Sequence, residues 1–284
     1  MKNLRDYITL TKPRLNFLAI VTTLAGFYLA SPKPMDVSLL LFTLLGSTCV
    51  AGGCGVLNQW LEADADAQMT RTRKRPLPSG RVKSRDAFWF GVVLSVVGVG
   101  VLELKTNDLT ALLGMCALVS YVILYTPLKK LTSLCTVVGA IPGAIPPLMG
   151  WTAAQDAIGP GGWTLFFILF LWQMPHFLAI AWMYREDYAR AGFPMLTVVD
   201  KHGESTGLMA VAYSAALVPV SLLPSYLGIT GAVYFWAALV LSLGFVWTSF
   251  SLARHKTLYH ARGLFWFSIT YLPLLFLVMV LDKR

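Results

Sequence analysis

Nine long apolar stretches alternate with shorter polar segments along the chain. They lie at about 15–31, 37–60, 87–103, 108–126, 132–152, 162–184, 207–227, 230–252 and 263–281. An α-helix needs about 20 apolar residues to cross the hydrocarbon core of a bilayer. The pattern therefore predicts an all-α polytopic membrane protein with nine transmembrane helices, folded as a single domain over residues 1–284.

Composition and charge support this interpretation. Hydrophobic residues make up 56% of the 284 positions and charged residues only 13%, which excludes a soluble globular domain of this size. The net charge of +9 does not indicate nucleic acid, because the basic residues lie between the apolar runs. With the N-terminus inside, 19 of the 23 Lys and Arg residues fall on the inner side, which predicts a cytoplasmic N-terminus and an external C-terminus.

Two of the inner loops, at about 61–86 and 185–206, are long and hold most of the acidic residues. Chemistry is therefore expected in a central cavity that opens to the cytoplasmic side. Pro142, Pro146 and Pro147 interrupt the fifth apolar run. Non-helical backbone at membrane depth is tolerated where protein or a cavity covers it, so we expect a broken helix that lines the cavity.

The sharpest chemical feature is an acidic stripe at the end of the second run. Asn58, Glu62 and Asp66 are spaced by four residues, which places their oxygen-bearing side chains on one helix face and Asp64 on another. Hard oxygen ligands of this kind suit Mg²⁺, which binds through one or two carboxylates together with substrate phosphates. The alternative is a solvated acidic helix end, but acids there oppose the helix macrodipole.

Basic residues follow the stripe directly, at Arg71, Arg73 and Arg75. A metal site followed within ten residues by several guanidinium groups is suited to a diphosphate, whose remaining oxygens the arginines would bind. Lys129 and Lys130, in a short inner loop, are explained largely by topology and are added as candidate diphosphate ligands.

The second long inner loop follows a run that contains Trp172 and His176. Asp187 comes eleven residues after His176, which returns to within about 20° of the same helix face, so both could line one cavity. Asp187, beside Glu186, is a candidate second metal-binding carboxylate. An intramembrane histidine is usually a packing residue, but ionisable groups at this depth are functional candidates.

With these motifs the sequence resembles the UbiA superfamily of intramembrane prenyltransferases, whose first motif is N-x-x-x-D-x-x-x-D. Within the superfamily it is similar to the branch that farnesylates haem. The matching segments are 11–14, 71–80, 143–151, 172–177 and 187–196, and the last three apolar runs carry little signature. Two departures are present: Glu62 replaces the first Asp of the motif, and Asp187 with Glu186 replaces a second motif that commonly has two Asp residues.

The resemblance implies farnesyl diphosphate and haem B as substrates, haem O and diphosphate as products, and Mg²⁺ as cofactor. It implies a multi-pass protein of the bacterial cytoplasmic (inner) membrane whose product serves haem-copper oxidase assembly or a haem A synthase. Asn58, Glu62, Asp66 and Asp187 are the expected catalytic metal ligands, and His176 and Trp172 are expected near the haem.

Three alternatives remain open from the residues. A prenyltransferase for an aromatic quinone precursor would share the diphosphate site, and His176 with the Trp172 and Trp151 segments favours a porphyrin acceptor over it. A cation transporter would also place carboxylates in the membrane, but the arginines that follow them favour an anion. The chain could also be a non-catalytic assembly factor, but such a protein would not need a stripe of metal-binding side chains.

Overall fold

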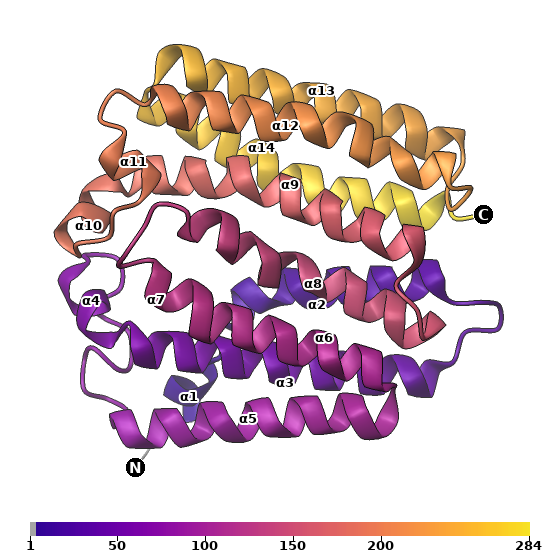
Figure 1. The fold of residues 1–284 in the computed structure, drawn as a ribbon, viewed down its shortest axis with the longest axis horizontal. Helices are drawn as coiled ribbons and strands as arrows, with labels where there is room; N and C mark the ends of the chain where they lie inside the picture. Colours follow the sequence, from indigo (N-terminus) through magenta and orange to yellow (C-terminus); the bar gives the residue numbers. More distant parts are fainter. Residues whose placement is uncertain (1–3) are drawn as a thin grey trace.

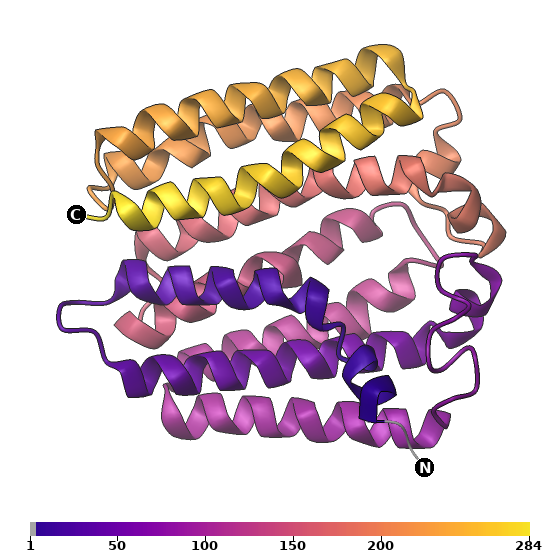
Figure 2. The ribbon, with the colours of Figure 1, turned by 180° about the vertical axis from the view of Figure 1, so that it is seen from behind.

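The computed structural model describes residues 4–284, and its long helices lie side by side in one bundle (Figure 1, Figure 2). The helices, with one π-helical segment η1, are α1 (Leu4–Leu10), α2 (Pro13–Ala30), α3 (Val37–Leu61), α4 (Ala63–Gln68), α5 (Ser84–Lys105), α6 (Asp108–Val119), η1 (Ser120–Tyr125), α7 (Thr126–Leu128), α8 (Cys135–Gln155), α9 (Gly159–Met183), α10 (Arg185–Arg190), α11 (Leu196–Val199), α12 (Glu204–Tyr226), α13 (Ala232–His255) and α14 (Leu258–Leu281). Within residues 4–284 the protein is thus all-α.

The nine predicted transmembrane helices are confirmed. Nine helical segments within residues 4–284 are long and apolar enough to cross a membrane, with α6, η1 and α7 forming one of them. Each end lies within five residues of its prediction. Polar side chains cap the N-termini of two of these helices. Asp36 accepts a hydrogen bond from Leu39 N at the start of α3, and Asn107 accepts one from Thr110 N at the start of α6.

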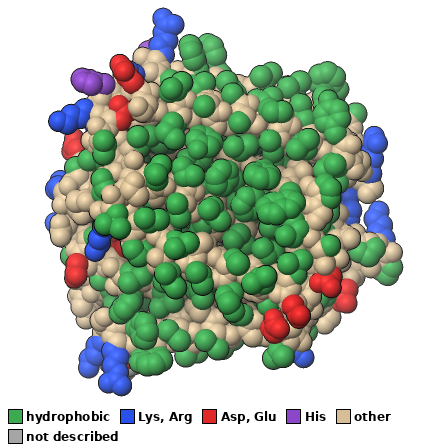
Figure 3. All heavy atoms as spheres, viewed as in Figure 1, with side chains coloured by type: hydrophobic (Ala, Val, Ile, Leu, Met, Phe, Trp, Pro, Cys, Tyr) green, Lys and Arg blue, Asp and Glu red, His purple; other side chains and the backbone are tan. Residues whose placement is uncertain are grey.

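The surface matches a multi-pass integral membrane protein. Hydrophobic side chains cover the middle of the face in Figure 3, while Lys and Arg gather at the two ends of the bundle. Many large apolar residues are exposed along the helices, among them Leu41, Val96 and Trp247. The short helices α4, α10 and α11 cluster at one end of the bundle, and the C-terminus lies at the other (Figure 1).

The expected break in the fifth span is wrong, because α8 continues as one helix through Pro142, Pro146 and Pro147. Close packing holds it: at Gly150 a Cβ would overlap the carbonyl of Thr23 on α2, and at Gly143 a Cβ would overlap the side chain of Gln173 on α9. Neighbouring helices thus fix the path of α8 despite the lost backbone donors. The expectation that this segment lines a cavity is confirmed, since Pro142 and Pro146 do so.

Replacing Gly150 with Val is expected to destabilise the bundle by about 1–3 kcal/mol or more, because the added side chain would push α2 away from α8. Thermal unfolding of the purified protein in detergent measures the effect as a lower Tm. The matched control is Gly100→Ala on α5, where a Cβ meets nothing within 4 Å. Equal Tm values for the two variants would contradict this account of the α2–α8 contact.

Candidate active site

The acidic stripe at the end of α3 lies as predicted. Asn58, Glu62 and Asp66 are 1%, 4% and 1% exposed, whereas Asp64 is exposed. Helix α3 ends at Leu61 and α4 begins at Ala63, yet Asp66 N donates to the carbonyl of Glu62 at 2.8 Å. This hydrogen bond continues the helical register across the junction, so the three side chains keep to one side.

A cation lies against each residue of the stripe. Lys12 Nζ donates to Asn58 Oδ1 at 2.6 Å, and Lys129 Nζ lies 2.9 Å from Glu62 Oε1. Arg75 forms an ion pair with Asp66 Oδ2 at 2.6 Å. Since burying an unpaired carboxylate is costly, these cations stabilise the buried acids in the protein alone.

Segment η1 orients Asn58. The Thr126 hydroxyl that follows η1 donates to the carbonyl of Tyr121 at 2.8 Å and accepts a hydrogen bond from Asn58 Nδ2 at 2.9 Å. The amide group of Asn58 therefore faces Thr126, and its Oδ1 oxygen faces Lys12. Single π-helical turns often occur at functional sites, and here the turn places the residue that fixes an amide orientation.

Burial and neighbouring charges shift the pKa values of three ionisable groups that lie just outside the membrane-spanning segments. Burial raises the pKa of Glu62, but the ammonium groups of Lys129 and Lys12 lower it more, so that it lies below 4.5. Burial lowers the pKa of Lys129, yet Tyr125 and Glu62 raise it well above 10.5. Burial and the repulsion of Arg75 lower the pKa of Lys12 from 10.5 to about 7. Glu62 and Lys129 are thus held as an ion pair at neutral pH.

Two oxygens of the stripe fit a metal ion. Within residues 4–284, Asp66 Oδ1 is buried and accepts no hydrogen bond, and Glu62 Oε1 has Lys129 within ion-pair distance but lacks an aligned hydrogen bond. Buried oxygens without such bonds are rare and are suited to a hard cation. Within residues 4–284 no three His, Cys, Asp or Glu side chains form one metal-binding group. The protein ligands that fit Mg²⁺ are therefore the two carboxylates with Asn58. Water molecules and phosphate oxygens of a substrate would fill the remaining coordination positions of the ion.

Asp187 lies at the same end of the bundle but outside this group. It is buried on α10 and forms an ion pair with Arg190, which also donates to Thr70 Oγ1 at 3.0 Å. Residues of both long loops, Met69, Phe193 and Met195, belong to one apolar cluster that joins the loops. The structure thus brings Asp187 to the loop that follows the stripe and pairs it with its own cation.

The predicted basic residues divide into two groups. Arg75 and Lys129 contact the stripe, whereas Arg71, Arg73 and Lys130 are exposed. Arg71 lies over the ring of Tyr184, with its Cζ atom 5.2 Å from the ring centroid. In the protein alone, only Arg75 and Lys129 of the predicted set lie against the carboxylates.

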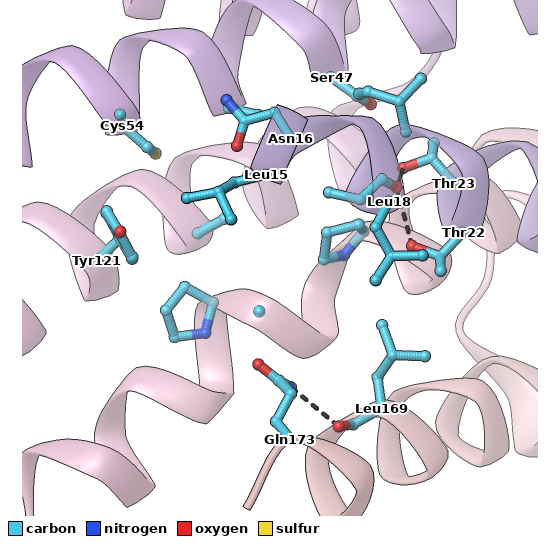
Figure 4. Close-up of a pocket in the computed structure, with 18 of the residues that line it drawn as sticks. Leu15, Asn16, Leu18, Thr22, Thr23, Ser47, Cys54, Tyr121, Leu169 and Gln173 are labelled. Atoms are coloured by element: carbon cyan, nitrogen blue, oxygen red, sulfur yellow. Dashed lines mark hydrogen bonds between the residues drawn. The ribbon is translucent and has the colours of Figure 1, made fainter. Parts of the chain in front are cut away.

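A largely apolar cavity of about 340 Å³ lies beside the stripe. Figure 4 shows Leu15 and Leu18 of α2 on one side of it and Gln173 of α9 across from them. Lys12 lines the cavity and also donates to Asn58, so it connects the cavity with the acidic stripe. A long apolar chain in the cavity would therefore place a charged head group at Lys12.

His176 and Trp172 both line this cavity. The expectation that Asp187 shares the cavity with His176 is not met, since Asp187 does not line it. Helix α9 ends at Met183, and Tyr184 has φ −113° and ψ 23°, yet Tyr188 N donates to the carbonyl of Tyr184 at 3.1 Å, so the helical register continues into α10 as it does at Glu62. The angular argument gives the helix face but not the depth: eleven residues advance about 16 Å along the axis, and Asp187 pairs with Arg190 beyond the end of the span.

Sequence reasoning missed three polar residues of the site. They are Lys12, which the sequence explains as one of the inner-side basic residues, and Thr126 and Gln173, which carry no charge or motif spacing that indicates a role. Gln173 lines the cavity and donates to the carbonyls of Ala140 and Leu169 (Figure 4). Lys12 directly before Pro13, at the edge of an apolar run, was the one available local signal.

Comparisons with known proteins identify the family of the chain. The model of the UbiA prenyltransferase family matches residues 19–278. A protoheme IX farnesyltransferase of Solibacter usitatus is 47% identical, with 99% of each chain covered. A protein of the same name from Myxococcus xanthus is 46% identical, with 98% of this chain and 94% of the relative covered.

Solved structures share the fold at lower identity. A structure of digeranylgeranylglyceryl phosphate synthase matches with a TM-score of 0.84 at 19% identity, covering 99% of both chains. A UbiA homologue from Archaeoglobus fulgidus bound to DMAPP and Mg²⁺ matches with a TM-score of 0.72 at 15% identity, covering 96% of this chain and 99% of the other. From the family match and these relatives, the chain belongs to the UbiA prenyltransferase family.

Proposed function

We propose that this prenyltransferase transfers a farnesyl group from farnesyl diphosphate to a vinyl group of haem B with addition of one water, giving haem O and diphosphate. The observation that carries the proposal is the junction at Lys12, where a buried carboxylate and cation site meets an apolar cavity. The donor would lie across this junction, with its diphosphate at the charged end and its chain in the cavity. Relatives named protoheme IX farnesyltransferase, similar over nearly the whole chain, support haem B as acceptor.

The residues of the site would act on the leaving group. A bound Mg²⁺ would supply charge neutralisation on the diphosphate as the allylic C–O bond breaks and its electron pair leaves with the diphosphate. Asn58, Glu62 and Asp66 would hold the ion, with Asp187 as a further candidate ligand from the adjoining loop. Lys12, Arg75 and Lys129 would pair with diphosphate oxygens, with Arg71, Arg73 and Lys130 nearer the loop surface.

The cavity would control what reacts with the farnesyl cation. Its apolar wall would exclude bulk water until the vinyl electrons of the porphyrin form the new C–C bond. One water then adds its oxygen to the resulting cation and releases a proton, which leaves a hydroxyl on the product. His176 and Trp172, both on the cavity wall, would contact the haem.

We place the protein in a bacterial inner membrane, with its N-terminus and the α4 and α10 end on the cytoplasmic side. Haem O would then serve haem-copper oxidase assembly, directly or through a haem A synthase.

Turnover of the purified protein in detergent tests the reaction. Haem B, farnesyl diphosphate and Mg²⁺ are supplied, and the products are separated by mass. A haem that gains a hydroxyfarnesyl group, with the gain abolished by EDTA, would support the reaction and the metal together. If haem B stays unchanged and an aromatic quinone precursor supplied in its place is prenylated, the acceptor is the quinone precursor and not haem B. If neither compound is prenylated, the proposal is overturned.

Replacing Lys12 with Met is expected to raise the KM for farnesyl diphosphate by about tenfold or more, because a charged hydrogen bond contributes about 1.5–3 kcal/mol. Initial rates at varied donor concentration measure the change. The matched control is Arg14→Met, since Arg14 lies two residues away and is exposed. An unchanged KM in the Lys12 variant would exclude Lys12 from diphosphate binding.

A further inference from the structure

His176 on the cavity wall is held by two aromatic rings. Its ring is stacked with that of Trp172, with centroids 5.0 Å apart and planes 17° apart. It is also stacked with Phe265 of α14, at 5.3 Å and 21°. The imidazole therefore has little freedom to rotate, although packing alone does not determine which ring nitrogen carries the proton.

A hydrogen bond to Ser268 of α14 determines the protonated nitrogen. His176 Nδ1 lies 2.7 Å from Ser268 Oγ, and Ser268 Oγ donates to the carbonyl of Phe265 at 2.6 Å. A serine hydroxyl has one proton, and here the Phe265 carbonyl accepts it. Ser268 Oγ must then accept a hydrogen bond from His176, which assigns the imidazole proton to Nδ1.

Ser268 also fixes the neighbouring aromatic ring. The indole Nε1 of Trp172 donates to the backbone carbonyl of Ser268 at 2.9 Å. Ser268 is completely buried, and its hydrogen bond with Trp172 is buried as well, so water does not compete for that bond. One residue of α14 thus orients both cavity side chains that α9 contributes for the acceptor.

The remaining ring nitrogen of His176 is available to a ligand. With the proton on Nδ1, the Nε2 atom is neutral and carries a lone pair. Within residues 4–284 no group hydrogen-bonds to Nε2, while His176 lines the cavity. A neutral imidazole nitrogen is a common protein ligand of haem iron, and such histidines usually donate their other N–H to a fixed acceptor.

We propose that Ser268 is a positioning residue that holds His176 with its Nε2 lone pair free, so that Nε2 ligates the iron of the haem acceptor. This inference rests on the proposed function, because it takes haem as the acceptor. It also gives a physical basis for selecting a metalloporphyrin over a quinone precursor, which has no iron for Nε2 to bind.

Binding titrations with and without iron test the proposal. Hemin is titrated into the purified full-length protein in detergent, with no farnesyl diphosphate present, and the Soret band reports affinity and ligation. Iron-free protoporphyrin IX is titrated in parallel and followed by its fluorescence. Ser268→Ala is expected to weaken hemin binding by about tenfold or more and to remove the histidine-ligated spectrum, since losing the partner of a ligating histidine costs about 10–100-fold. Its affinity for protoporphyrin IX should equal that of the wild type.

The matched control is Ser249→Ala on α13. Ser249 is also completely buried, but its hydroxyl has no hydrogen-bond partner in the described part of the chain. This variant should bind both porphyrins as the wild type does. Wild-type ligation and hemin affinity in Ser268→Ala would overturn the proposal. Equal weakening for hemin and protoporphyrin IX would also overturn it, because Ser268 would then only shape the cavity.

The same titration separates this inference from the proposed function. A wild type that shows no histidine-ligated hemin would overturn the role of Ser268 and His176 even if it farnesylates haem. A wild type that ligates hemin, loses the ligation in Ser268→Ala, and yet transfers no farnesyl group would support the inference and contradict the proposed reaction.

Discussion

Replacing Asp66 with Asn is expected to lower kcat for prenyl transfer by at least about 10²–10³-fold, the loss typical of removing one group that stabilises transition-state charge. Asn keeps the size of the side chain and one oxygen but removes the negative charge. Asp66 is 1% exposed, and its Oδ1 atom has no hydrogen-bond partner within residues 4–284, so this oxygen is free to bind a cation. Rates with farnesyl diphosphate and haem B at saturating Mg²⁺ measure the loss.

Asp64→Asn is the matched control for this prediction. Asp64 lies on the same short helix, two residues away, and is exposed, so its replacement should leave kcat unchanged. A second measurement guards against misfolding: Mg²⁺ with diphosphate should raise the Tm of the wild type and of Asp64→Asn, because a ligand stabilises the state that binds it. The Asp66 variant should be folded and show no such rise. A fully active Asp66→Asn enzyme would exclude the metal site at this stripe.

Local sequence was sufficient for the spans and for the acidic stripe. Membrane helices are apolar on both their packed and their lipid-facing sides, so the runs reveal their position without tertiary information. The spacing of Asn58, Glu62 and Asp66 depends only on helical geometry, and the hydrogen bond from Asp66 N to the Glu62 carbonyl preserves it across a helix junction. The same geometry did not place His176 and Asp187 in one cavity, because eleven residues separate them by about 16 Å along the helix axis and Asp187 pairs with Arg190 beyond the end of the span.

The partners of the stripe could not be predicted, because they come from distant parts of the chain. Lys12 is 46 residues from Asn58, and Lys129 belongs to the loop after the fourth span. Positive-inside bias accounts for both lysines in the sequence, so no local pattern distinguishes a topological cation from one that pairs with a buried acid. Ser268 lies in a span without signature residues, and its role depends on the packing of α14 against α9.

Replacing Lys129 with Met is expected to destabilise the protein by about 3–5 kcal/mol, because it leaves Glu62 charged and buried without its nearest partner. The side chains of Lys129 and Glu62 are only 14% and 5% exposed, so water would compensate little. The Tm in detergent should fall by on the order of 10 °C, given about 2–4 °C per kcal/mol for a chain of this size class. Lys130→Met is the control, since Lys130 is exposed and forms no ion pair within residues 4–284.

The pH dependence of this difference distinguishes a lost ion pair from lost packing. The pKa of Glu62 is lowered below 4.5, so its contribution to stability is present above pH 4.5 and is lost as the pH falls through the lowered pKa. The pKa of Lys129 is raised above 10.5, so its contribution is present below pH 10.5 and is lost as the pH rises through the raised pKa. The Tm difference between wild type and Lys129→Met should therefore be largest between these limits and should narrow as the pH falls below 4.5. If the Tm difference between wild type and Lys129→Met stays constant as the pH falls below 4.5, the lower stability of the variant comes from lost packing of the lysine side chain. Packing does not depend on the charge of Glu62.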